Sequence, residues 1–206
     1  MAFAAMNEMK GDLPVITFTS AEQWGAWLAQ AAATSKGLWL KLAKKGTQAR
    51  SVSHKDAIEI ALCHGWIDGQ LDKYDDQWWL VRFTPRSPKS KWSQANRTAA
   101  LKLIEEGRML EPGLEQVQAA QADGRWEAAY ASQGSAAVPA DLEAALEAAP
   151  EAKRFFAELN RANRFAILYR IQDAKTEKTR LQRIQKFVAM LERGEMIHPP
   201  KKTSKA

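Results

Sequence analysis

The sequence predicts an α+β fold, in which a small, mainly antiparallel sheet with helices precedes a C-terminal helical domain. Short strand-like runs alternate with capped helices up to residue 107, and two such runs flank a five-residue loop at 73–77. Beyond residue 140 the apolar residues recur at helical spacing. We therefore expect an α+β domain at 12–131, a basic helical domain at 138–197, and disorder at 1–11 and 198–206.

The first part of the chain predicts two strands around one helix. Residues 15–18 are β-prone, and Ser20 begins a Ser-Ala-Glu-Gln capping box. Trp24 and Trp27 follow at the spacing of one helix face, so both indoles are assigned to the core. Alternating leucines within 38–42 predict the next strand.

A second helix, a hairpin and a third helix complete the predicted α+β domain. Ser53 and Ser93 can each cap a helix that a later glycine ends. Residues 66–72 and 78–83 have the pattern of two hairpin strands, and the prolines within 84–91 predict a loop. The small, polar segment 132–140, broken by a proline, is the expected domain boundary.

Length and composition exclude several classes of protein. The chain has 206 residues, of which 46% are hydrophobic and 26% charged, as is typical of a globular protein. No apolar run approaches the roughly 20 residues that span a bilayer, so no membrane insertion is expected. Residues 1–10 lack the pattern of a secretory signal, which predicts a cytoplasmic location. One cysteine cannot form an internal disulfide.

No motif with a specific chemistry stands out. The glycines do not form a dinucleotide-binding or P-loop pattern, and His54, His64 and His198 lack metal-ligand spacing. We therefore expect no cofactor, no metal and no assigned catalytic residue. His64 and Asp68 flank Trp66, so a small hydrolase or transferase that uses this pair as acid and base is kept as an alternative.

The positive charge is unevenly distributed. Of the formal net charge of +6, only +1 belongs to the chain up to residue 131. The window 81–104 nevertheless contains six basic residues and no acidic one. A basic surface favours anionic partners, although the same charge can serve solubility alone.

The tryptophans near this window define the predicted binding site. Trp66, Trp78, Trp79 and Trp92 bracket the hairpin and the basic loop, where indole rings beside guanidinium groups can stack on an aromatic or anionic small ligand or on a peptide. Because neighbouring strand residues point to opposite faces, at most one of Trp78 and Trp79 can enter the same core. The residues expected to line the site are Trp66, Asp68, Arg82, Arg86, Lys89, Lys91, Trp92 and Asn96.

Three stretches of the chain resemble a known family. They are Ala-Leu-Cys-His-Gly-Trp-Ile-Asp-Gly at 61–69, Arg-Phe-Thr-Pro-Arg-Ser-Pro-Lys-Ser-Lys-Trp-Ser-Gln-Ala-Asn at 82–96, and Ala-Lys-Thr-Glu-Lys-Thr-Arg at 174–180. Together they resemble the YdeI/OmpD-associated family, and the resemblance is expected to cover roughly residues 15–197, nearly the whole chain. The resemblance implies a role in bacteriocin protection, envelope stress or antimicrobial-peptide resistance in bacteria, and it brings no cofactor and no established reaction.

We accordingly expect a non-enzymatic binding protein of bacterial stress protection. A second hypothesis is weak, nonspecific nucleic-acid binding by the same loop together with a secondary basic patch of Lys175, Arg180 and Arg183. The small hydrolase or transferase is the third.

Overall fold

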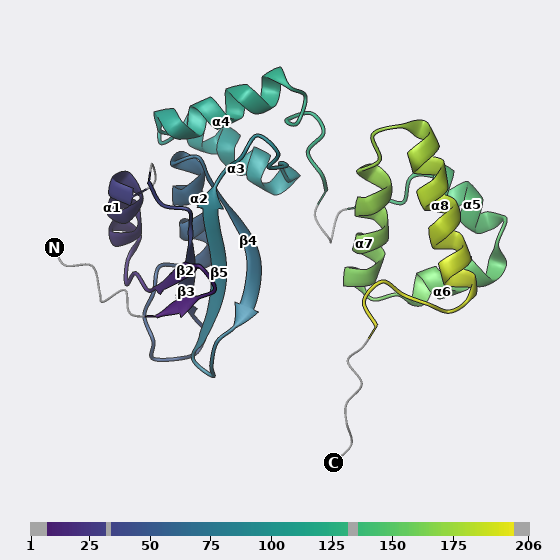
Figure 1. Cartoon of the computed structure of the whole chain (residues 1–206), viewed down its shortest axis with the longest axis horizontal. Coiled ribbons are helices and arrows are strands. Elements are labelled where there is room, and N and C mark those ends of the chain that lie inside the picture. The colour runs from purple at the N-terminus through teal and green to yellow at the C-terminus, as the bar shows by residue number, and fades with distance from the viewer. Residues whose placement is uncertain (1–7, 32–33, 132–135, 200–206) are drawn as a thin grey trace, which may run out of the picture. The chain divides into compact units, whose positions relative to one another are not determined.

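The computed structural model describes residues 8–31, 34–131 and 136–199. The chain divides into two compact units, with the division between Ala129 and Tyr130. Unit 1 is an α+β domain, and unit 2 is helical (Figure 1). The predicted α+β fold class is confirmed.

Unit 1 is built on a five-stranded mixed sheet. Its strand order is β1-β2-β3-β5-β4; β2 and β3 are parallel and the other neighbours are antiparallel. The parallel pair is joined by a helix, as the β-α-β connection requires. The elements are β1 (Met9–Lys10), β2 (Leu13–Ile16), α1 (Ala21–Ala31), β3 (Leu38–Ala43), α2 (His54–Cys63), β4 (Trp66–Lys73), β5 (Trp78–Pro85), α3 (Gln94–Glu105) and α4 (Glu111–Ala122).

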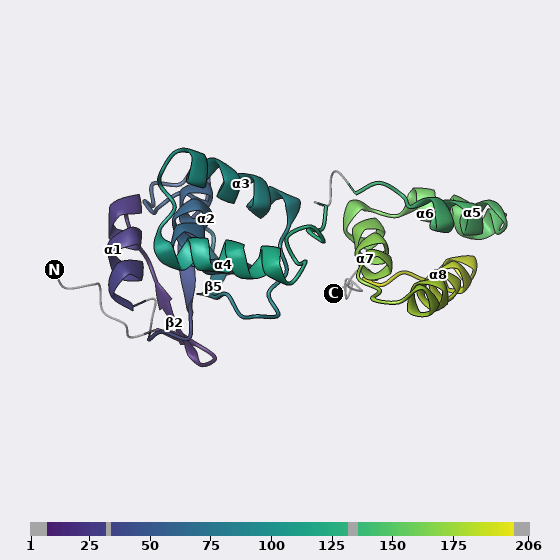
Figure 2. The same cartoon turned by 90° about the horizontal axis from the view of Figure 1, so that it is seen from above.

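The main core of unit 1 is aromatic. Trp24 and Trp27 of α1 stack with their ring centroids 5.6 Å apart, and Trp66 of β4 meets both rings edge-on. Phe18 and Phe83 complete this cluster, which α1 and α2 cover from one face of the sheet. The assignment of Trp24 and Trp27 to the core is therefore confirmed. Farther along, α3 and α4 both pack against α2 (Figure 2).

Local sequence signals place the helix ends. Ser53 and Ser93 accept hydrogen bonds from the backbone N–H groups three residues later, as predicted for N-caps. Gly65, with φ +72°, turns the chain from α2 into β4, and a side chain there would meet the Pro112 carbonyl at 2.7 Å. Helix α4 was not predicted, because it begins at Glu111 without a side-chain cap.

The described part of unit 2 contains four helices. Its core is aliphatic with two phenylalanines, Phe156 and Phe187, and it includes residues from every helix. The helices are α5 (Ala140–Glu147), α6 (Pro150–Glu158), α7 (Arg161–Gln172) and α8 (Glu177–Glu192). In the part of the chain that the structure describes, none of them combines the length and the apolar character that crossing a membrane requires.

The structure corrects the expected disorder at both ends of the described chain. Met9 and Lys10 form β1, because their backbone pairs with β2. The backbone N–H of His198 donates to Asn163 Oδ1 at 2.7 Å, and Asn163 Nδ2 donates to the His198 carbonyl at 3.0 Å. These bonds tie the end of unit 2 to α7. The rest of the prediction, for 1–7 and 200–206, lies outside the described residues.

Candidate functional site

Arg86 and Trp92 form the centre of the predicted loop, and they contact each other. The Arg86 guanidinium lies over the Trp92 ring, 3.6 Å from its centroid, and Nη1 donates to the Lys91 carbonyl at 3.3 Å. Arg86 is 7% exposed and Trp92 2% exposed. The two side chains are buried and form a cation–π contact with each other. The Trp92 ring is therefore not offered to a ligand, which corrects its expected stacking role.

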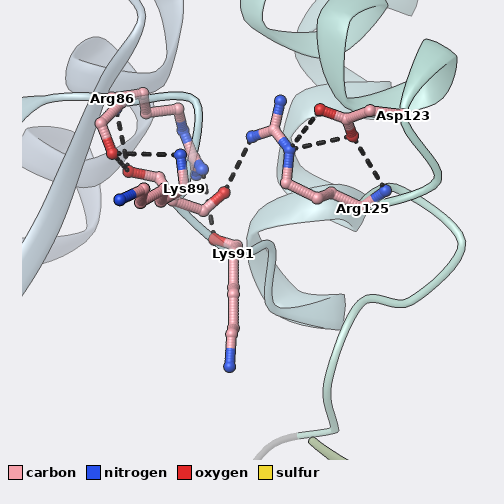
Figure 3. A network of polar contacts seen from close by, with 7 residues as sticks. Arg86, Lys89, Lys91, Asp123 and Arg125 are labelled. Carbon is pink, nitrogen blue, oxygen red and sulfur yellow. Dashed lines mark hydrogen bonds and ion pairs between the residues drawn. The ribbon is translucent and has the colours of Figure 1, made fainter. Parts of the chain in front are cut away.

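Hydrogen bonds join the loop to the segment that follows the C-terminus of α4. Figure 3 shows Arg125 between Asp123 and the loop that contains Arg86, Lys89 and Lys91. Arg125 Nε bonds both carboxylate oxygens of Asp123, and Arg125 Nη1 donates to the Ser90 carbonyl at 2.9 Å. The side chains of Lys89 and Lys91 are exposed on the loop surface. The basic loop is therefore a surface turn that hydrogen bonds hold in place, and the Arg86 side chain within it is buried.

The sheet separates two other predicted site residues. Trp66 is 1% exposed in the aromatic core, so it has no face for a ligand. Arg82 lies between Val81 and Phe83 on β5, and these two residues belong to that core. In the sheet, Arg82 pairs with Trp39 of the neighbouring strand β3. Because alternate strand residues point to opposite faces, Arg82 lies on the face away from Trp66. The expectation that both line one site is wrong.

Asp68 and Asn96 do meet. Asn96 Nδ2 donates to Asp68 Oδ1 at 3.3 Å, and both side chains are half-buried. Burial lowers the pKa of His54 at the start of α2, and the charge of Asp68 partly offsets this effect. His64 is the C-cap residue of α2, where burial lowers its pKa. No hydrogen bond between His64 and Asp68 is seen within the described ranges.

The predicted secondary basic patch is mostly engaged in unit 2. Arg180 forms a two-pronged ion pair with Asp141, at 2.5 and 2.8 Å, and donates to the Ile171 carbonyl. Arg183 donates to the Arg170 carbonyl. Lys175 is exposed. Two of the three cations thus join helices to one another, which corrects the expectation of an open phosphate-binding patch.

A groove of about 500 Å³ runs between α5 and α8 of unit 2. We call it the α5/α8 groove. Its α8 residues recur every three or four positions along the whole helix, so they form one stripe. Leu181 in this stripe is 55% exposed. The lining residues are Asp141, Ala145, Glu177, Arg180, Leu181, Ile184, Gln185, Val188, Ala189 and Glu192.

Comparison with protein families identifies the unit that holds the groove. Residues 135–194 match the family described as "Bacteriocin-protection, YdeI or OmpD-Associated". Residues 135–194 are therefore similar to the YdeI/OmpD-associated family. The resemblance noted in the sequence is thereby confirmed for this part of the chain.

The match to the YdeI/OmpD-associated family lies within unit 2, whereas most of unit 1 matches a different family, so the expectation that the resemblance spans nearly the whole chain is corrected. Residues 16–116 match the "Domain of unknown function (DUF8412)", and both N-terminal stretches of the resemblance lie in that part. No match was found among curated proteins or among solved structures.

The α5/α8 groove was missed in the sequence. The near-heptad spacing of Leu181, Ile184, Val188 and Leu191 indicates one buried face. In the structure Ile184 and Leu191 are buried, whereas Leu181 is exposed. The sequence carries no separate signal for the exposed leucine, because α5, α6 and α7 all pack against α8 and the tertiary fold decides which apolar residues they cover. Within the described ranges, no three His, Cys, Asp or Glu side chains gather as metal ligands would.

Proposed function

We propose that this protein is a non-enzymatic binding protein of bacteriocin or antimicrobial-peptide protection, and that the α5/α8 groove binds a cationic amphipathic helix. One observation carries the proposal: the α8 wall of the groove lies between two glutamates and includes the exposed Leu181 and the half-buried Val188, in the part of the chain that matches the bacteriocin-protection family. Helix-in-groove binding is a common mode of recognition for amphipathic peptides.

The dimensions of the groove suit a helix of about four turns. Its lining extends from Glu177 to Glu192 on α8. At a rise of 1.5 Å per residue this stripe is about 22 Å long. Leu181, Val188 and Ala189 supply apolar surface along it, and an incoming helix would bury that surface with leucines at i, i+3, i+4 and i+7.

The charges around the groove favour a cationic partner. Arg180 is held by Asp141, whose pKa it lowers through hydrogen bonds, so the arginine is neutralised at the groove wall. Glu177 and Glu192 are exposed at the two ends of the stripe. Lysines on the polar face of a bound helix would lie near these carboxylates. The attraction would increase the association rate and weaken as salt is added.

A labelled peptide and one matched pair of variants test this proposal. The probe is a fluorescein-labelled, 15-residue Leu/Lys amphipathic helix, titrated with the full chain by fluorescence anisotropy. Leu181→Lys removes apolar contact and adds a like charge, so the Kd should rise at least about tenfold. Leu101→Lys adds the same charge to α3 of unit 1, where Leu101 is 48% exposed, and should leave the Kd unchanged.

Other outcomes would overturn the proposal. Equal affinity of Leu181→Lys and the parent protein would place binding elsewhere, and equal affinity for a scrambled peptide would reduce it to charge attraction. A dimer that Leu181→Lys dissociates, seen by light scattering, would assign the groove to a second copy.

The envelope-stress role and the cytoplasmic location stay predictions. The nucleic-acid hypothesis is less favoured, since Arg86, Arg180 and Arg183 bond within the fold.

A further inference from the structure

Unit 1 has a pocket that no sequence motif indicated. Its volume is about 500 Å³, within the range of small-molecule sites. It lies where Thr19, the end of β3, the segment that leads into α2 and the start of β5 come together. We call it the Trp79 pocket. Its lining residues are Thr19, Leu42, Ala43, Lys45, Ala49, Arg50, Ser51, Val52, Ser53, His54 and Trp79.

The inner wall of the Trp79 pocket is apolar and aromatic. Leu42 and Val52 are buried, and the half-buried Trp79 packs against the main core. The His54 ring meets the Trp79 ring in a T-shaped contact with centroids 4.9 Å apart. This contact and the core behind it restrict the indole to one orientation. A positioned, partly accessible indole is a surface on which a planar ring can stack.

Hydrogen bonds hold the segment that forms the rim. The Val52 backbone N–H donates to the Phe18 carbonyl at 2.8 Å. Ser51 Oγ accepts from the Ala43 N–H at 2.9 Å and donates to the Val52 carbonyl. Ser53 caps α2. The pocket is therefore formed before any ligand arrives, which lowers the entropy cost of binding.

The electrostatics of the Trp79 pocket favour an anion. Lys45 and Arg50 are exposed at the rim, and none of the lining residues is acidic. Two acidic residues lie outside the lining: Asp56 accepts a hydrogen bond from Ser53 Oγ at 2.7 Å, and the charge of Asp68 acts on His54. The ten-residue helix α2 begins at the pocket, and its N-terminus adds partial positive charge.

The His54 side chain in the pocket wall has one polar atom without a hydrogen-bond partner. His54 Nε2 is buried and makes no hydrogen bond with any described residue. Most buried polar side-chain atoms in folded proteins have a partner, so an unmet one calls for an explanation. Burial also lowers the pKa of His54, which favours the neutral imidazole beside Trp79.

We propose that the Trp79 pocket binds a small aromatic carboxylate. The ring stacks on Trp79 against Leu42 and Val52, and the carboxylate meets Arg50 and Lys45 at the rim. This inference goes beyond the proposed peptide binding, because it concerns the other unit and an anionic ligand. Its failure would leave the α5/α8 groove untouched.

Calorimetric titration of the full chain with three probes tests the ligand class. The probes are 2-naphthoate, the neutral 2-naphthylmethanol and the non-aromatic cyclohexanecarboxylate. The first should bind at least about tenfold more tightly than either of the others, because only it offers both the ring and the charge. Equal affinity for 2-naphthylmethanol, or no binding of 2-naphthoate, would overturn the proposal.

Two arginine variants locate the binding. Arg50→Ala should weaken 2-naphthoate binding about tenfold, the typical loss of one charged hydrogen bond. Arg82→Ala also removes an exposed arginine of unit 1, but on β5 outside the pocket lining, and should change nothing. Equal losses in both variants would indicate unspecific charge attraction and contradict the proposal.

Short peptides distinguish the source of the carboxylate. A hexapeptide that ends in tryptophan is compared with its C-terminal amide and with N-acetyltryptophan. If N-acetyltryptophan binds at least as tightly as the peptide acid, the ligand is a free small acid. Much tighter binding of the peptide acid alone would replace the small molecule by a peptide C-terminus and overturn that part of the proposal.

Discussion

The two units bury different kinds of side chains. All eight tryptophans of the chain lie in unit 1, where Trp24, Trp27 and Trp66 form an aromatic cluster under two helices. Unit 2 contains no tryptophan, and its core consists of small and aliphatic residues with Phe156 and Phe187. Unit 1 thus combines aliphatic residues with a cluster of large aromatic rings, whereas the core of unit 2 contains no indole.

This difference teaches which residues mark a binding surface. In unit 1 the conspicuous residues Trp66, Arg86 and Trp92 serve packing, and each is at least 93% buried. In unit 2 the candidate groove is marked by an ordinary leucine, Leu181, that the helices leave exposed. Large aromatic residues contribute most to cores, so their concentration in a sequence indicates a core before it indicates a ligand.

Removal of a core indole should produce the largest effect and confine it to unit 1. Trp66→Ala leaves a cavity beside Trp24 and Trp27, and truncation of a buried tryptophan costs about 3–5 kcal/mol. Urea unfolding followed by tryptophan fluorescence reports on unit 1 alone. That transition should shift strongly to lower urea concentration. The part of the helical circular-dichroism signal that comes from unit 2 should keep its midpoint.

The half-buried Trp78 supplies the matched control. Its ring contacts the Lys41 ammonium, with 5.2 Å from the nitrogen to the ring centroid, outside the main core. Trp78→Ala should therefore cost only about 0.5–1 kcal/mol. If both tryptophan variants unfold at the same urea concentration, the division into core and surface indoles is incorrect.

Much of the fold follows from local sequence signals. Ser53 and Ser93 mark their helices because a hydroxyl before a helix satisfies an N–H group that the helix leaves unpaired. The hairpin at 66–83 follows from two β-prone runs around a polar loop. Strand β1 could not be predicted in the same way, because two residues carry no periodicity and depend on β2 for their bonds.

The candidate sites were harder to predict because they depend on distant contacts. Whether Trp66 faces a ligand or the core depends on α1, which lies about forty residues earlier in the chain. Arg180 is basic in the sequence, yet Asp141, 39 positions away, neutralises it. The Trp79 pocket joins residues from four segments, and only the tertiary fold brings them together.

The buried asparagine of unit 2 should give an intermediate effect, now confined to that unit. Asn163 is 1% exposed and exchanges two hydrogen bonds with the backbone of His198. Asn163→Ala removes both, at a cost of about 1–3 kcal/mol. Circular dichroism at 222 nm should show an earlier transition with unchanged tryptophan fluorescence. The exposed Arg161→Ala on the same helix should behave like the parent protein, and a fluorescence change with Asn163→Ala would contradict the independence of the units.

The smallest expected effect is a difference between the two units in how their stability depends on pH. Burial lowers the pKa of His54 and His64, so the unfolded chain binds more protons than folded unit 1 just below pH 6.5. The stability of unit 1 should therefore decrease as the pH falls from about 6.5. In unit 2, hydrogen bonds from Arg180 lower the pKa of Asp141, so that contribution is present above about pH 3.8 and is lost only below it. Between pH 6.5 and 5, tryptophan-detected melting should shift to lower temperature while the unit 2 transition stays in place. His54→Phe keeps an aromatic ring against Trp79 without a titrating group, and it should reduce the shift; an unchanged pH dependence in that variant would exclude His54 as its source.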